Sequence, residues 1–223
     1  MMVALCRHQL VHLNAAGWAT VQQRPWDDEA RACLAHWAAQ RLPLVVTQQR
    51  DGVPDDRIAL GLPAPLQWQR RRLALQVPMR GVLYCDEFPR AAEVTGLLPP
   101  RTRGAWQTLL KALAALGVAP RVYGSFGWQR LTRLDYLHAD SDLDLRLPVA
   151  DAATADAVVA ALHASVFATP RLDGEIVFPG GSAVAWREWR LWRERRADRV
   201  LVKRLRGVAM ERGEAWLVEH QPC

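Results

Sequence analysis

The sequence lacks the features of a membrane or exported protein. None of the apolar runs in its 223 residues approaches the roughly 20 residues that a membrane-spanning helix requires. The N-terminus MMVALCRHQL also lacks the apolar core and the cleavage site of a signal peptide. We therefore expect a cytoplasmic protein with no membrane partner.

Cysteine is also sparse. The four cysteines are scattered and form no C-x-x-C pair, so neither a zinc site nor a disulfide framework is indicated. Internal repeats and low-complexity tracts are missing too, which argues against repeat architectures. Half of the residues are hydrophobic and 23% are charged, so the composition is that of a globular protein large enough to bury a core.

Positive charge is present in excess. The formal net charge is +6 and the sequence pI is about 9.7, which favours anionic partners such as nucleotides, nucleic acid or an acidic protein. Between residues 186 and 206, nine Lys or Arg residues accompany only three acidic ones. This segment is either a solvated basic helix face or a surface that binds an anion.

Proline and glycine divide the chain into two units. A helical pattern over 27–40 and a short apolar strand over 42–47 begin the first unit, which continues to residue 90 as short strands and loops interrupted by prolines. Residues 91–104 contain Pro99, Pro100 and two glycines, the composition of a connection. We predict an N-terminal domain over 1–90, a linker over 91–104 and a second domain over 105–223.

The second unit alternates helices and strands. Its pattern predicts a helix over 105–116, a strand over 120–123, a turn at Gly124-Ser125, a strand over 142–147, a helix over 151–165 and a strand over 175–178. The whole chain is thus expected to have an α/β (α+β) fold.

Two carboxylates fall on one face of a predicted strand. In SDLDLRL, Asp142 and Asp144 share parity, opposite to Leu143 and Leu145, and same-face neighbours are roughly 7 Å apart. Such a pair repels unless a cation compensates, and Mg²⁺ with substrate phosphates is a common solution. Arg146 has the same parity, so a structural pair with Asp144 is the alternative.

A turn that suits phosphate precedes these carboxylates. In VYGSFGW, a short strand leads into Gly124 and Ser125 at what looks like the start of a helix or a tight turn. Glycine permits close approach of the backbone to a ligand, free amides attract an anion, and Ser125 offers a hydroxyl. An ordinary Gly-Ser turn is the alternative interpretation.

Together, Gly124-Ser125 and the following D-x-D resemble the signature of the nucleotidyltransferase superfamily. The resemblance implies a third carboxylate from a later strand, which here would come from LDGEIVF, where Asp173 and Glu175 share parity. We prefer Glu175, which leads directly into the apolar residues of that strand, and keep Asp173 as the substitute. The resemblance to this superfamily also implies the fold of the two units. Residues 105–223 would form a nucleotidyltransferase-like domain, with a mixed sheet flanked by helices, after a small N-terminal α/β domain.

A closer resemblance comes from strings spread along residues 123–205, namely YGSFGWQ, LDYL, SDLDL, DGEIVFPGG, AVAWREW and VLVKRL. They are similar to the phosphoribosyl-dephospho-CoA transferases of malonate decarboxylase systems, also called holo-acyl-carrier-protein synthases. His8-Gln9-Leu10-Val11 looks like the opening segment of that family, although the similarity is fainter there.

The family resemblance implies a reaction. The enzyme would take 2'-(5-triphosphoribosyl)-3'-dephospho-CoA and transfer its phosphoribosyl-dephospho-CoA part to a serine of the apo acyl carrier protein of malonate decarboxylase, releasing diphosphate. Asp142, Asp144 and Glu175 would hold Mg²⁺, and Glu175 could assist deprotonation of the serine. Gly124 and Ser125 would bind the leaving phosphates, and Lys203 would add a phosphate contact.

Two other functions fit parts of the sequence. One is a transferase that uses an ordinary nucleoside triphosphate to modify a small molecule or an RNA end. The other is a non-catalytic module in which the basic residues of 187–206 follow nucleic-acid phosphates and tryptophans stack on bases. Nucleic acid is the less favoured partner, because Asp142 and Asp144 would add unused negative charge to such a surface.

Overall fold

The structure is a computed structural model that describes residues 5–165, 167 and 169–218. The expected α/β (α+β) fold is confirmed by two separate sheets, of five and six strands, with helices around them. Within the described residues, no helix is both long and apolar enough to cross a membrane.

The N-terminal unit is an antiparallel sheet covered by two helices. Its strands, in the spatial order β4-β3-β2-β1-β5, are β1 (Leu10–Leu13), β2 (Leu44–Val46), β3 (Arg57–Pro63), β4 (Arg72–Pro78) and β5 (Val82–Asp86). The helices are α1 (Ala15–Gln22) and α2 (Asp28–Ala39). Short 3-10 turns at Leu66–Trp68 and Met79–Gly81 lie on either side of β4.

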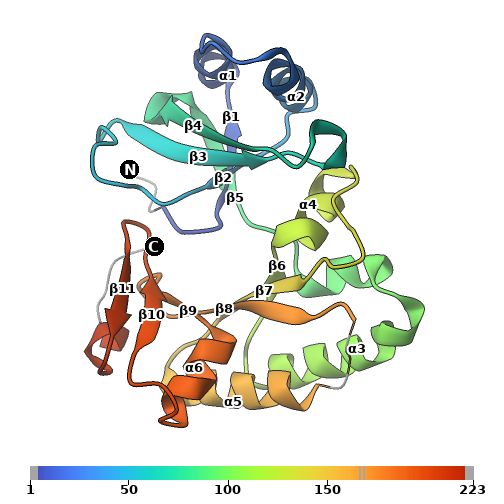
Figure 1. The fold of residues 1–223 in the computed structure, drawn as a ribbon, viewed down its shortest axis with the longest axis vertical. Coiled ribbons are helices and arrows are strands. Elements are labelled where there is room, and N and C mark those ends of the chain that lie inside the picture. Colours follow the sequence, from blue (N-terminus) through green and yellow to red (C-terminus); the bar gives the residue numbers. More distant parts are fainter. Residues whose placement is uncertain (1–4, 166, 168, 219–223) are drawn as a thin grey trace.

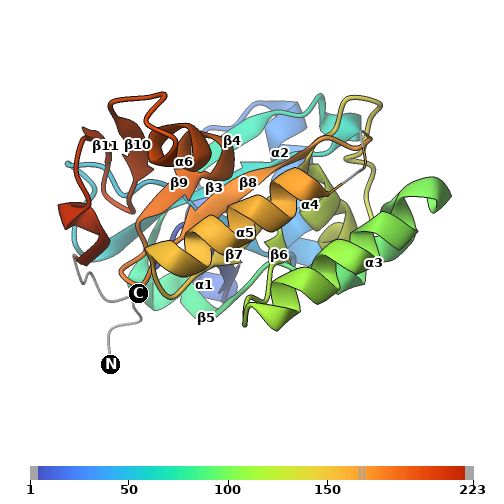
Figure 2. The same cartoon turned by 90° about the horizontal axis from the view of Figure 1, so that it is seen from below.

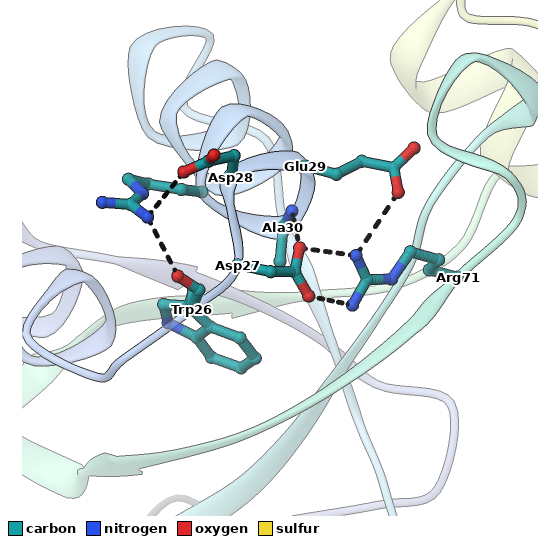
Figure 3. Close-up of polar contacts among 7 residues, drawn as sticks. Trp26, Asp27, Asp28, Glu29, Ala30 and Arg71 are labelled. Atoms are coloured by element: carbon teal, nitrogen blue, oxygen red, sulfur yellow. Dashed lines mark hydrogen bonds and ion pairs between the residues drawn. The ribbon is translucent and has the colours of Figure 1, made fainter.

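Helix α2 begins where the sequence predicts, because Asp27 caps it. The Asp27 carboxylate accepts a hydrogen bond from the Ala30 amide at 2.9 Å, and the same two oxygens receive Nη1 and Nη2 of Arg71 at 2.6 Å each (Figure 3). Glu29 adds a longer contact to Arg71 at 3.4 Å. The cap thus fixes the helix start and ties it to the segment just before β4.

The C-terminal unit has a mixed sheet with the spatial order β11-β10-β9-β8-β7-β6. Its strands are β6 (Arg121–Val122), β7 (Leu143–Pro148), β8 (Leu172–Val177), β9 (Ala183–Ala185), β10 (Val200–Lys203) and β11 (Val208–Glu211). Among the strands that the structure describes here, only β7 and β8 pair in parallel, and α5 (Ala152–Ala164) connects them. The other helices are α3 (Pro100–Ala115), α4 (Gly124–Thr132) and α6 (Trp186–Arg193), and a 3-10 turn, Ala215–Val218, follows β11.

The two sheets face each other with helices on their outer sides. Figure 1 shows α1 and α2 beyond the N-terminal sheet and α3, α5 and α6 beyond the C-terminal sheet, and Figure 2 shows these last three spread over the outer face. Leu143, Leu145 and Leu147 of β7 are fully buried in the core under those helices. The polar residues that alternate with them therefore point towards the N-terminal unit.

The predicted linker over 91–104 is wrong. Ala91–Leu97 form a 3-10 helix, η3, and α3 already begins at Pro100. Ala91, Val94 and Leu98 are buried in the C-terminal core, whereas Phe88 packs in the N-terminal core. Pro99 and Pro100 were interpreted as part of a connection, but they lie at the start of α3. Proline is well tolerated in the first turn of a helix, because an amide at that position would have no partner within the helix.

The cysteines also differ from expectation. Cys6 is disulfide-bonded, although the spacing of the cysteines gave no indication of a disulfide. Cys33 and Cys85 are free thiols, and Cys33 is buried.

Candidate active site

The candidate site lies on the inner face of the C-terminal sheet, where β7 and β8 begin. Asp144 and Asp173 are directly opposite each other in the parallel register of these strands, so their side chains emerge side by side on one face. Asp142, the predicted first residue of the strand, is the last residue before β7, which begins one position later at Leu143. The D-x-D motif and Asp173 are thus gathered at one edge.

Gly124 brings the start of α4 against Asp144. Its φ of +61° lies in the left-handed region, and a Cβ added at this position would lie only 1.9 Å from Oδ2 of Asp144. Both observations require glycine here, since a side chain would collide with the carboxylate and strain the backbone. The Gly-Ser turn and the D-x-D motif therefore meet in the structure as the sequence predicted.

The first turn of α4 has free hydrogen-bonding groups. Its N-cap residue, Tyr123, makes no side-chain capping bond, and in the described part of the chain no group hydrogen-bonds to the Ser125 hydroxyl. The first amides of a helix lack intrahelical partners and carry a partial positive charge. This end of α4 is suited to a phosphate group beside the carboxylates.

The three aspartates differ in their electrostatic environment. Burial, followed by the charges of Asp173 and Asp142, raises the pKa of Asp144 to about 7. The pKa of Asp142 is instead lowered, mainly by its hydrogen bonds with Arg171. Asp144 is therefore a carboxylate whose negative charge is poorly compensated, which is the situation that a bound cation relieves.

Arg171 now occupies part of the position that a cation would take. It donates from Nε at 2.9 Å and from Nη2 to the two oxygens of Asp142, and Nη2 lies 3.4 Å from Oδ2 of Asp173. In the described ranges, no three His, Cys, Asp or Glu side chains are arranged to hold one metal ion. The Arg171 side chain is 60% exposed, so it is free to turn into solvent when a stronger cation binds Asp142.

Glu175 has a different environment from the aspartates. Its register partner is Arg146, and its side chain, only 6% exposed, receives Lys203 Nζ at 2.8 Å and lies 3.2 Å from His8 Nε2 and 3.5 Å from Arg7. Burial opposes its ionisation, but the contacts with His8, Lys203 and Arg7 outweigh this and hold its pKa at about 2. Glu175 and Lys203, predicted as metal and phosphate ligands, are thus paired with each other.

Two residues of this cluster were missed from the sequence. Arg7 and His8 come from the segment before β1, and His8 also stacks on Tyr123 with ring centroids 4.2 Å apart. The similarity of His8-Gln9-Leu10-Val11 to a family opening segment was the one available signal. Arg146, considered as a partner for Asp144, has Glu87 as its nearest acid, at 4.0 Å.

The basic segment over 186–206 includes α6 and β10, and five of its nine Lys and Arg residues form ion pairs. Arg193 contacts Asp156 at 2.8 Å and also Glu214, while Arg190 contacts Glu194 at 3.0 Å. Trp186 and Trp189, two tryptophans of this segment, are buried in the core. These tryptophans are unable to stack on bases, which counts against a nucleic-acid-binding module.

Comparison with known families and proteins identifies relatives of this chain. The family model described as phosphoribosyl-dephospho-CoA transferase MdcG N-terminal domain matches residues 6–88, and that of the C-terminal domain matches residues 89–214. A phosphoribosyl-dephospho-CoA transferase of Xanthomonas euvesicatoria pv. vesicatoria is 36% identical over 88% of this chain and 89% of its own length. A phosphoribosyl-dephospho-CoA transferase of Bradyrhizobium diazoefficiens is 37% identical over 82% of this chain and 80% of its own length. No solved structure matches.

Proposed function

This chain belongs to the phosphoribosyl-dephospho-CoA transferase family, and we propose that it attaches the prosthetic group of malonate decarboxylase. The donor is 2'-(5-triphosphoribosyl)-3'-dephospho-CoA, and the acceptor is a serine of the apo acyl carrier protein. The observation that carries the proposal is the contact of Asp144 with Gly124, which joins the carboxylates to the free amides of α4.

We propose that the carboxylates bind Mg²⁺ after a rearrangement, since within the described ranges they form no ready metal site. Asp142, Asp144 and Asp173 are hard oxygen ligands gathered at one edge, and the raised pKa of Asp144 reflects negative charge that has no full counter-charge. When bound, Mg²⁺ would neutralise phosphate oxygens and stabilise the charge of the departing diphosphate. Displacement of Arg171 from Asp142 would accompany metal binding.

Asp173 is better placed than Glu175 to be the third carboxylate. It is the register partner of Asp144, and its charge is the largest charge effect on the pKa of Asp144, whereas that of Glu175 is smaller. The oxygens of Glu175 are already engaged by Lys203 and His8. We therefore propose that Asp173 binds the metal and that Glu175 positions the surrounding cations. With its pKa lowered to about 2, Glu175 is also a weak base.

The protein groups have distinct parts in the transfer. The serine Oγ forms a bond to the α-phosphorus of the triphosphoribosyl group as the bond from that phosphorus to the diphosphate oxygen breaks, and the hydroxyl proton leaves to solvent. The amides of α4 and the Ser125 hydroxyl hold the departing diphosphate. Lys203, fixed by Glu175, faces the same side of the sheet and adds positive charge there.

The net charge of +6 suits the proposed protein partner. Complementary charge accelerates the encounter of two proteins, and an acidic carrier protein would be attracted to this molecule. A transferase that uses ordinary nucleoside triphosphates is not favoured, because the relatives are named for the dephospho-CoA reaction.

The test is the reaction itself. The protein is incubated with apo acyl carrier protein, Mg²⁺ and either the triphosphoribosyl precursor or ATP, and the carrier protein is weighed by intact-mass spectrometry. We expect the mass of the phosphoribosyl-dephospho-CoA group to be added with the precursor only. Addition of a nucleotide from ATP, or no addition from the precursor, would contradict the proposal.

A further inference from the structure

Beyond the aspartates, the inner face of the C-terminal sheet contains a small cavity. It has a volume of about 50 Å³ and lies between the segment before β1 and the strands β6 and β7. The charged side chains that define this arginine cavity are Arg7, Glu87, Arg121 and Arg146, and His8 and Tyr123 are among the other residues that line it. No part of the function described so far uses these arginines.

Arg146 lacks the partner that a buried guanidinium normally has. Its side chain is 19% exposed, and in the described residues it makes no hydrogen bond, the nearest acid being Glu87 at 4.0 Å. The Glu87 carboxylate is paired more closely with Arg121 than with Arg146. Arg121 also donates a hydrogen bond to the Phe88 carbonyl at 2.6 Å. Burial of Arg146 is costly without a closer anion.

Arg7 is similarly under-used on the opposite wall of the cavity. Its closest acid is Glu175, at 3.5 Å, and that carboxylate is shared with Lys203 and His8. The Nε atom of Arg7 is buried and has no hydrogen-bond partner in the part of the chain that the structure describes. A buried donor without an acceptor is unfavourable, and an oxygen atom of a ligand would satisfy it.

The cations around this cavity outnumber the acids. Arg7, Arg121, Arg146 and Lys203 are opposed by Glu87 and Glu175 alone among the contacts described. Guanidinium groups match phosphate oxygens in geometry as well as charge. The cavity therefore has the chemistry of a phosphate site.

Its position links it to the candidate active site. Arg146 follows Asp144 by two residues on the same strand and the same face, a spacing of roughly 7 Å. One polyphosphate ligand could therefore reach both. Resting on the proposed function, we propose that the arginine cavity binds a second phosphate group of the same substrate, with Arg146 and Arg7 as its ligands. That phosphate belongs either to the triphosphate end or to the diphosphate bridge of the dephospho-CoA part.

Two probes distinguish these sources. Binding of inorganic tripolyphosphate and of dephospho-CoA is measured by isothermal titration calorimetry, with Mg²⁺, for the wild type, Arg146→Gln and Arg72→Gln. Arg72 is an exposed residue of β4 and serves as the control. We expect R146Q to weaken one probe about tenfold, the loss of one charge-assisted contact, and R72Q to weaken neither. The weakened probe identifies the source.

Equal binding of both probes by R146Q and the wild type would overturn the inference, as would a wild type that binds neither. If R146Q does not fold, Arg7→Gln gives the same comparison. The transfer assay separates this inference from the proposed function. Weaker binding by R146Q without transfer by the wild type would leave the phosphate site standing alone. If the wild type transfers the group and R146Q binds both probes as the wild type does, the proposed function is supported and the phosphate site is not.

Discussion

Asp144 has the most perturbed acidity in the aspartate cluster. Its pKa of about 7 in the folded protein lies above the ordinary value of a carboxyl group, so the folded state holds this proton more tightly than the unfolded chain. The contribution of protonated Asp144 to the free energy of unfolding is fully present below the ordinary pKa of an aspartate. This contribution is lost as the pH rises through the folded-state pKa of about 7.

Asp144→Asn should therefore stabilise the metal-free protein at pH 8 but not at pH 4. One pKa unit corresponds to about 1.4 kcal/mol, so we expect D144N to gain about 2 kcal/mol at pH 8 after allowance for solvent screening. Urea unfolding with a chelator at the two pH values measures this, with the exposed Asp55→Asn as the control. A D144N variant with the same pH dependence as the wild type would contradict the electrostatic argument.

Substitution of Asp173 and of Glu175 should have different effects on transfer and on stability. Asp173→Asn is expected to remove transfer, about 100-fold or more, with little effect on stability. Glu175→Gln removes the carboxylate that pairs with Lys203 and Arg7, so it should cost about 3 kcal/mol of stability and leave measurable transfer. Urea unfolding and the mass assay read the two effects. A stable E175Q variant as inactive as D173N would return the metal role to Glu175.

The sequence predicted part of the site at residue level. The meeting of Gly124 with Asp144 followed from the motif, because Gly124 comes just after β6, and β6 pairs with β7, in which Asp144 lies. The choice between Asp173 and Glu175 did not follow, since both residues have the same parity and only the register of β8 against β7 separates them. The contact of His8 with Glu175 joins residues 167 positions apart, a separation for which local patterns carry no information.

At the scale of elements, the turn between β6 and α4 depends on one glycine. Gly124→Ala should lose transfer and stability together, because the added Cβ meets Asp144 and the backbone has φ of +61°. Gly117→Ala is a matched control, with φ of +72° and nothing within 4 Å of the added atom. It should cost about 1 kcal/mol and keep full transfer. Equal effects of the two substitutions in both assays would show that the contact with Asp144 is unimportant.

Elements with strong local signals were predicted well. Helix α5 begins after Asp151, whose carboxylate accepts from the Thr154 amide at 2.8 Å, and α2 begins after Asp27 in the same way. The short strands β9 and β10 were not predicted, because three or four residues carry little periodicity and their pairing with β8 and β11 holds them. Helix α4 was anticipated only as a helix start or tight turn.

At the scale of the whole molecule, α4 joins the two cores. Phe126 packs in the C-terminal core and Trp128 in the N-terminal core, and the buried Tyr136 donates its hydroxyl to the Pro63 carbonyl at 2.7 Å. The site itself contains residues of both units, through His8 and Glu175. The two units thus both contribute residues to the candidate site.

This arrangement predicts cooperative unfolding. Because α4 contributes to both cores, we expect urea to unfold the molecule in a single transition, with the same midpoint by tryptophan fluorescence and by far-UV circular dichroism. Tyr136→Phe should lower the free energy of unfolding by about 1 kcal/mol without dividing the transition. Two separate transitions in the wild type would show that the units fold independently.

The central claim is that Asp144, held against Gly124, belongs to the group-transfer site. The most direct test is the mass of apo acyl carrier protein after incubation with the triphosphoribosyl precursor, Mg²⁺ and either the wild type or Asp144→Asn, whose folding is checked by circular dichroism. We expect a full mass shift with the wild type and none with folded D144N. A folded D144N variant that modifies the carrier protein at the wild-type rate would contradict this claim.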